Sequence, residues 1–268
     1  MADIENSSRI PAASIEDASG AGASGDYIQG GRRLEANRGV AWIREGWGYF
    51  RRQPALWAIL ALIFGAFLIA LQYVPVVGPL ATLLLMPVLA GGLISGCLSI
   101  DRGGELELAH LFAGFRRNTG QLVLIGLIGF ALTFAVLTPA VMLMGPSAFM
   151  AVMGSGTASA VGIAGMLGLL IATALFVPVN MALWFAPALV MVQAQSAPRA
   201  IAESFRGCLK NIVPFLVYGV ILLVLAMIAS IPFGLGWLVL GPVVIGSVYA
   251  AYRDIYVPAG KAREAARI

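Results

Sequence analysis

The chain has 268 residues, of which 60% are hydrophobic and 11% are charged, and its formal net charge at pH 7 is +4. In soluble domains roughly a quarter of the residues are charged. A soluble fold of this size could not bury so much apolar surface. Nucleic-acid binding is not indicated either, because the basic residues lie at the ends of apolar runs and not along one surface stripe.

Residues 1–37 differ from the rest of the chain. They are rich in Ser, Ala, Gly and acidic residues and lack apolar periodicity, which is typical of a disordered tail. A basic segment followed by an apolar region and a small-residue cleavage site is not found there, so the segment does not predict a signal peptide. The first apolar run is therefore expected to direct membrane insertion.

Six apolar runs predict six membrane spans within a membrane domain over residues 38–256. A hydrocarbon core of about 30 Å needs roughly 20 helical residues. The predicted spans are 55–74, 79–100, 121–144, 160–192, 212–231 and 235–252. The fourth is long enough for a span with an extension, and Pro178 and Pro187 mark where it should bend.

Basic residues flank the spans on one side only. They occur before the first span, between the second and third, between the fourth and fifth, and after the sixth. The other connections, around 75–78, 145–159 and 232–234, contain no charged residue. Because Lys and Arg are retained on the cytoplasmic side, both termini are expected in the cytoplasm, including a tail at 257–268.

The spans are predicted to form three similar hairpins, each starting after a Phe-Arg pair. The aligned positions are Phe-Arg at 50–51, 115–116 and 205–206, and Pro87, Pro187 and Pro242. Since each unit holds two spans, the repeats run parallel, unlike the inverted repeats of many transporters. The expected fold is an all-α integral membrane protein of three parallel-repeat hairpins.

A short amphipathic segment ends at each Phe-Arg pair, with apolar side chains at helical spacing, as in Val40, Ile43 and Trp47. Such segments predict short helices that lie in the membrane interface. Their basic residues serve either as plain interfacial anchors or as specific contacts for anionic lipid. The candidate lipid contacts are Arg51, Arg52, Arg116, Arg117, Arg206 and Lys210.

Four stretches, "FRRQPALW", "LLMPVLAGGL", "ALWFAPALVM" and "SFRGCLKNIVPFLVYG", resemble a family of six-helix inner-membrane proteins of Gram-negative bacteria. They are also similar to the membrane domain fused to some glycerophosphodiester phosphodiesterases. The resemblance covers residues 39–256 and implies the six-helix fold and a bacterial inner-membrane location. It implies no catalytic residues, because the phosphodiesterase activity of the fused relatives belongs to a separate soluble domain that this sequence does not contain.

Few side chains indicate catalysis. Glu107 and His110 form a Glu-x-x-His pair, but a di-iron bundle needs that pair twice, and His110 is the only histidine. No serine lies in a nucleophile-elbow pattern. Cys97 and Cys208 predict neither a disulfide framework nor a Cys-based metal site. We therefore expect no enzymatic activity, no cofactor and no metal.

Asn180 is the candidate polar site within the spans. Neutral polar side chains in membranes usually bridge neighbouring helices, although they can also mark a solute path. The preferred function is a non-enzymatic membrane module in envelope or lipid organisation, with membrane lipids, a second copy or other membrane proteins as partners, and no nucleic acid. The alternative is a permease or channel for a neutral or amphiphilic solute, with Asn180 and the broken fourth span lining its path.

Overall fold

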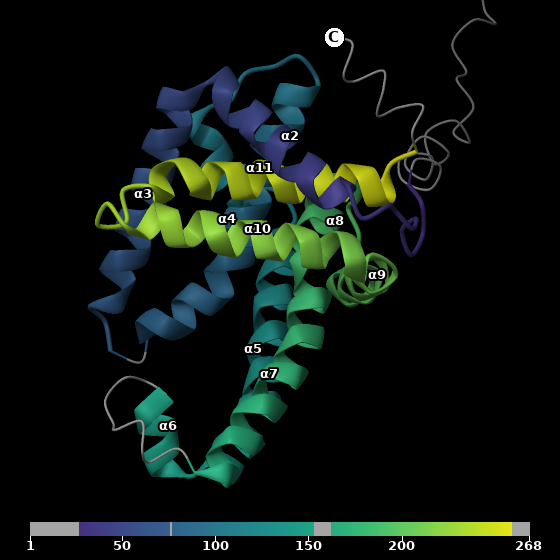
Figure 1. The fold of residues 1–268 in the computed structure, drawn as a ribbon. Helices are drawn as coiled ribbons and strands as arrows, with labels where there is room; N and C mark the ends of the chain where they lie inside the picture. Colours follow the sequence, from purple (N-terminus) through teal and green to yellow (C-terminus); the bar gives the residue numbers. More distant parts are fainter. Residues whose placement is uncertain (1–26, 76, 153–161, 259–268) are drawn as a thin grey trace, which may run out of the picture.

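The computed structural model describes residues 27–75, 77–152 and 162–258. Over these ranges the chain is helical and contains no strand, and six helices are long and apolar enough to cross a membrane (Figure 1). The predicted all-α class with six candidate spans is confirmed. The greater part of each predicted tail, residues 1–26 and 259–268, lies outside the described residues.

The spans follow the predicted order, with shorter helices between them. The spans are α3 (Pro54–Gln72), α4 (Val77–Asp101), α5 (Thr119–Met144), α7 (Ile163–Trp184) with α8 (Ala186–Gln193), α10 (Ile212–Ser230) and α11 (Trp237–Tyr256). The shorter helices in the described ranges are α2 (Arg38–Arg52), the 3₁₀ helix η1 (Leu108–Phe115), α6 (Pro146–Val152) and α9 (Ala197–Lys210).

The fourth span breaks at one of its two prolines. Phe185 separates α7 from α8, and Pro187 lies in the first turn of α8, where its missing N–H is tolerated. Pro178 instead lies inside α7, which continues past it to Trp184. The predicted bend at Pro187 is therefore a helix boundary, whereas Pro178 does not end its helix.

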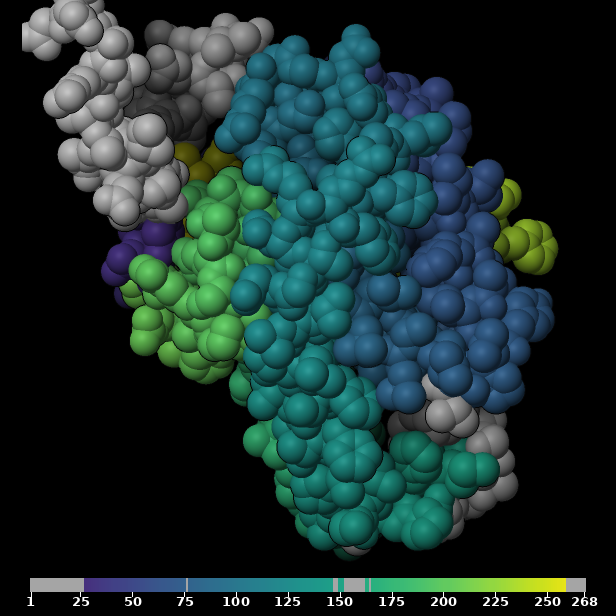
Figure 2. Space-filling view, turned by 180° about the vertical axis from the view of Figure 1, so that it is seen from behind, coloured from purple at the N-terminus to yellow at the C-terminus, as the bar shows by residue number. Residues whose placement is uncertain are grey.

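The helices form a body from which one hairpin projects. In Figure 1, α2 lies along α10 and α11, while α5 and α7 run together toward α6 at the lower end. Figure 2, seen from behind, shows α5 in teal between α9 in green and the blue atoms of α3 and α4. The α3–α4 and α10–α11 connections lie on the left of Figure 1, and the described ends of the chain lie on the right.

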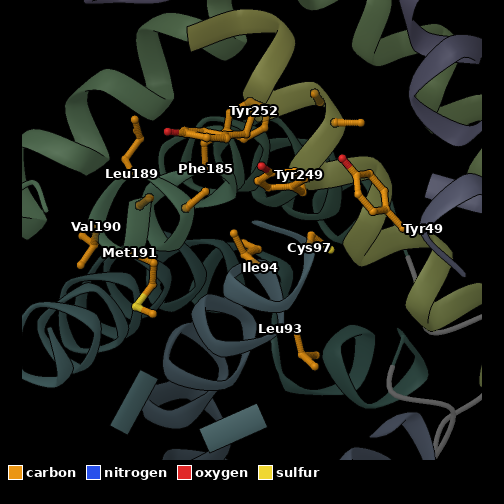
Figure 3. Close-up of a cluster of buried hydrophobic side chains, with 14 of the residues drawn as sticks. Tyr49, Leu93, Ile94, Cys97, Phe185, Leu189, Val190, Met191, Tyr249 and Tyr252 are labelled. Atoms are coloured by element: carbon orange, nitrogen blue, oxygen red, sulfur yellow. The ribbon is translucent and has the colours of Figure 1, made fainter. Parts of the chain in front are cut away.

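Much of the buried core lies in the second half of each hairpin's second helix, and α2, α3 and α5 contribute further residues such as Trp42, Trp57 and Leu122. Nearly all buried residues of α4 follow Pro87, those of α11 mostly follow Pro242, and α8 is buried almost throughout. Figure 3 shows Ile94 and Cys97 of α4 facing Tyr249 and Tyr252 of α11. The N-terminal halves of these spans expose large apolar side chains, as expected where lipid surrounds them.

Each short segment before a hairpin packs against a different hairpin from the one it leads into. The segment α2 lies on α10 and α11, η1 lies on α4, and α9 lies on α7 and α8. The segment before the third span is a 3₁₀ helix, whereas the other two are α-helices. These segments therefore tie neighbouring hairpins together, in addition to any role at the membrane surface. The repeat and the interfacial placement stay predictions.

Glycines permit the closest of these crossings. A Cβ atom at Gly46 of α2 would lie 2.4 Å from the carbonyl oxygen of Val243 in α11, and one at Gly114 would lie 2.1 Å from that of Val88 in α4. Backbone atoms cannot move aside as a flexible side chain can. Both crossings therefore require a residue without a side chain.

Residues 27–37, which the sequence predicts to be part of a disordered tail, pack onto α9 and α11. The backbone N–H of Ile28 donates to the carbonyl of Tyr256 at 2.7 Å, and that of Arg32 donates to the carbonyl of Ile255 at 2.9 Å. The last carbonyls of a helix have no partner within it. This segment therefore caps the C-terminal end of α11, which the composition of the tail did not indicate.

Candidate functional site

The polar centre of the molecule is a buried carboxylate at the end of α4. The Asp101 side chain accepts hydrogen bonds from the hydroxyls of Tyr49 at 2.6 Å and Tyr249 at 3.1 Å, and from the Arg253 guanidinium at 2.7 Å. Asp101 is 9% exposed. Three helices, α2, α4 and α11, therefore meet at one fully engaged carboxylate.

The same network continues along α2. Arg253 also donates to Glu45 at 2.7 Å, and Glu45 accepts from Arg38 at 2.8 Å. Arg38 in turn donates to Asp254 at 2.6 Å. Carboxylates and guanidinium groups thus alternate from α4 to the end of α11, so the buried Asp101 and each of the partly exposed charges have a neighbour of opposite sign. We call Arg38, Glu45, Asp101, Arg253 and Asp254 the ionic network.

Burial and neighbouring charges fix the protonation of two groups on α2. Burial raises the pKa of Tyr49 far above its usual range, against the smaller opposing effect of Arg253, so its hydroxyl keeps the proton that it donates to Asp101. Burial alone would lower the pKa of Arg38, but Asp254 and Glu45 outweigh it and the pKa is raised. The hydroxyl of Tyr49 and the guanidinium of Arg38 both act as hydrogen-bond donors to carboxylates, which fits a structural role.

The predicted lipid contacts divide into free and engaged side chains. Arg51, Arg116 and Arg117 are exposed, and their side chains form no hydrogen bond or ion pair with the described residues. The other three have partners within the protein: Arg52 donates to the carbonyl of Ile100, Arg206 pairs with Glu203 at 3.1 Å, and Lys210 donates to the carbonyl of Gly31 at 2.9 Å.

Asn180 lies on the wall of a pocket of about 360 Å³ between α7 and α10. Its amide group donates to the carbonyl of Phe176 one turn earlier, at 2.9 Å. Most of the other lining side chains are apolar. The indole N–H of Trp184, which also lines the pocket, has no acceptor in the described part of the chain. Asn180 is thus engaged within its own helix, and this geometry gives no support to a polar solute path.

The Glu-x-x-His pair forms a helix cap. The backbone N–H of Glu107 donates to Nδ1 of His110 at 2.9 Å, and the two side chains form a capping box at the start of η1. Within the described ranges, no cluster of His, Cys, Asp or Glu could hold a metal ion. Burial raises the pKa of the Cys208 thiol to about 12, so this thiol is not a reactive thiolate.

Comparison with known proteins supports a membrane location. A probable inner membrane protein of Burkholderia thailandensis is 29% identical to this chain over 211 residues, which cover 75% of this chain and 77% of the relative. No protein-family model and no solved structure matches the chain. With its six candidate spans, the chain is a multi-pass inner-membrane protein.

The sequence does not indicate the ionic network. Arg253 has the appearance of a topology signal after the sixth span, and no motif singles out Asp101. The one available signal was an isolated acidic residue directly after an apolar run of more than twenty residues. Such a residue becomes a candidate only when a partner is known, and Arg253 lies 152 residues further along the chain.

Proposed function

We propose that the protein is a non-enzymatic inner-membrane module that gathers anionic lipid around its basic end and so takes part in envelope or lipid organisation. The observation that carries this proposal is that Arg51, Arg116 and Arg117 have no side-chain partner among the described residues, whereas the half-buried Arg38 and Arg253 are paired with carboxylates. A guanidinium without a partner in the protein is available for a lipid phosphate.

Exposed aromatic side chains accompany these arginines. Trp47 is 43% exposed, and Phe112 and Phe115 are 53% and 42% exposed. Aromatic rings favour the level of the lipid headgroups, where basic side chains also reach anionic phosphates. The resemblance to the membrane domain of glycerophosphodiester phosphodiesterases belongs to this proposal, since such a domain also lies among phospholipids.

Removing the free arginines should reduce lipid selectivity. We expect purified wild-type protein to prefer phosphatidylglycerol over phosphatidylcholine in native mass spectrometry. The Arg51→Gln, Arg116→Gln, Arg117→Gln triple variant should lose this preference by about fivefold for each charge removed, because a basic residue near an anionic surface contributes about 1 kcal/mol. Arg206→Gln is the matched control, since its guanidinium is engaged by Glu203. Equal wild-type binding of both lipids would contradict the proposal.

We also propose that both termini face the cytoplasm, as the distribution of Lys and Arg predicts. Reporter fusions after Ile268 and within the connection between α4 and α5 are expected to report the cytoplasm. A fusion in the connection at 145–159, which contains no charged residue, should report the periplasm. A periplasmic signal at Ile268 would mean an odd number of spans and would overturn the assignment.

A further inference from the structure

An apolar groove of about 560 Å³ lies between α2, α10 and α11. Its walls include Ile221, Leu225 and Ile228 of α10 and Val239 and Val243 of α11. This volume lies in the range of roughly 300–1,000 Å³ that is usual for ligand pockets. The groove is therefore large enough to hold a small molecule or part of a lipid.

One end of the groove is basic. Val40, Ile43, Arg44 and Trp47 of α2 line it there, and Arg44 is the charged member of the lining. The neighbouring Glu45 is held by Arg38 and Arg253, but Arg44 is exposed and its side chain makes no ion pair or hydrogen bond with the described residues. The groove thus presents an available cation beside an otherwise apolar channel.

The length of the groove and the position of α2 favour an acyl chain over a helix as its occupant. From Ile221 to Ala229 it follows α10 for roughly 12 Å at 1.5 Å per residue, which is close to half of a 30 Å hydrocarbon core. At its basic end α2 crosses both helices, with Gly39 against Pro214 and Gly46 against Val243. A spanning helix from a partner would collide with α2, whereas an acyl chain of one leaflet could lie below it.

We infer that this groove binds one anionic phospholipid, with its phosphate at Arg44, its glycerol region beside Trp47 and one acyl chain along α10 and α11. The inference rests on the proposed function and gives it a defined site. In this arrangement two faces of α2 have different roles. One face contributes Arg38 and Glu45 to the ionic network, and the other contacts the lipid.

Native mass spectrometry of the full-length protein with phosphatidylglycerol tests this site. Arg44→Gln should weaken binding of the first phosphatidylglycerol molecule by about tenfold, because a hydrogen bond to a charged group contributes at least that factor. Ile221→Trp, which fills the groove, should weaken binding of phosphatidylglycerol and phosphatidylcholine alike. Val224→Trp is the matched control, since Val224 lies on α10 outside the groove and is 51% exposed. Unchanged thermal unfolding shows that each variant folds.

The outcomes separate the site from the wider proposal. If Arg44→Gln and Ile221→Trp bind like the wild type while the Arg51, Arg116 and Arg117 triple variant loses selectivity, the groove site is wrong and the proposed function stands. If neither set changes binding, both are wrong. A second protein chain bound in place of lipid, and released by Ile221→Trp, would also overturn the site.

Discussion

Arg253→Leu is expected to lower the free energy of unfolding by about 3–5 kcal/mol, the cost of leaving a buried charge without its partner. The Arg253 side chain is 17% exposed and pairs with both Asp101 and Glu45 at 2.7 Å. Its loss leaves the Asp101 carboxylate with the hydroxyls of Tyr49 and Tyr249 alone. Detergent-solubilised protein unfolded with increasing SDS and followed by tryptophan fluorescence gives the measurement.

A double variant distinguishes the loss of the Asp101–Arg253 ion pair from the loss of side-chain volume at position 253. In the double variant Asp101→Leu, Arg253→Leu, both charges are absent, so we expect part of the lost free energy to return. Recovery should be incomplete, because the hydroxyls of Tyr49 and Tyr249 then lack an acceptor. Arg51→Leu, which removes an exposed arginine of α2, should change stability by less than about 0.5 kcal/mol. A similarly small effect of Arg253→Leu would show that solvent screens the network.

Gly46→Leu is expected to disrupt the contact of α2 with α11 and to lower the free energy of unfolding by at least about 3 kcal/mol, the upper end of ordinary overpacking costs. The first added carbon would lie 2.4 Å from the carbonyl oxygen of Val243 and 2.7 Å from the backbone nitrogen of Ser247. Because the same helix carries Arg38 and Glu45, displacing it also separates members of the ionic network. The SDS titration used for Arg253→Leu measures the loss.

Gly48 supplies the control for this substitution. It lies in the same helix, and a Cβ atom there would meet nothing within 4 Å. Since alanine is favoured over glycine in a helix by up to about 1 kcal/mol, Gly48→Ala should be neutral or stabilising, whereas Gly46→Ala should already be destabilising. Equal stability of the two alanine variants would mean that α2 does not pack on α11 as closely as described.

The sequence does not distinguish the residues behind these effects from their neighbours. Gly46 and Gly48 are two residues apart in one helical segment, and nothing in their composition or spacing separates them. Only the position of α11 makes the first essential and leaves the second free. Likewise, Arg51 and Arg52 are adjacent and equally basic, yet Arg52 donates to Ile100 and Arg51 has no side-chain partner in the described ranges.

The sequence by itself determined the properties that depend on local composition. Apolar runs of sufficient length predicted six spans, because each membrane helix satisfies its own backbone hydrogen bonds and needs no distant partner. The sequence also marked Pro178 and Pro187 as bends, but a missing N–H does not decide which of them ends a helix, since α7 continues past Pro178.

Only the tertiary structure decided which side chains meet across the molecule. It placed α2 on the third hairpin instead of beside the first, joined Asp101 to Arg253, and left Arg44 free at the end of an apolar groove. These outcomes depend on contacts between residues far apart in the chain, and hydropathy and helical spacing carry no information about such pairs. A charged residue at the end of a span therefore has the same appearance in the sequence whether it marks topology, closes a buried network or is available to a lipid.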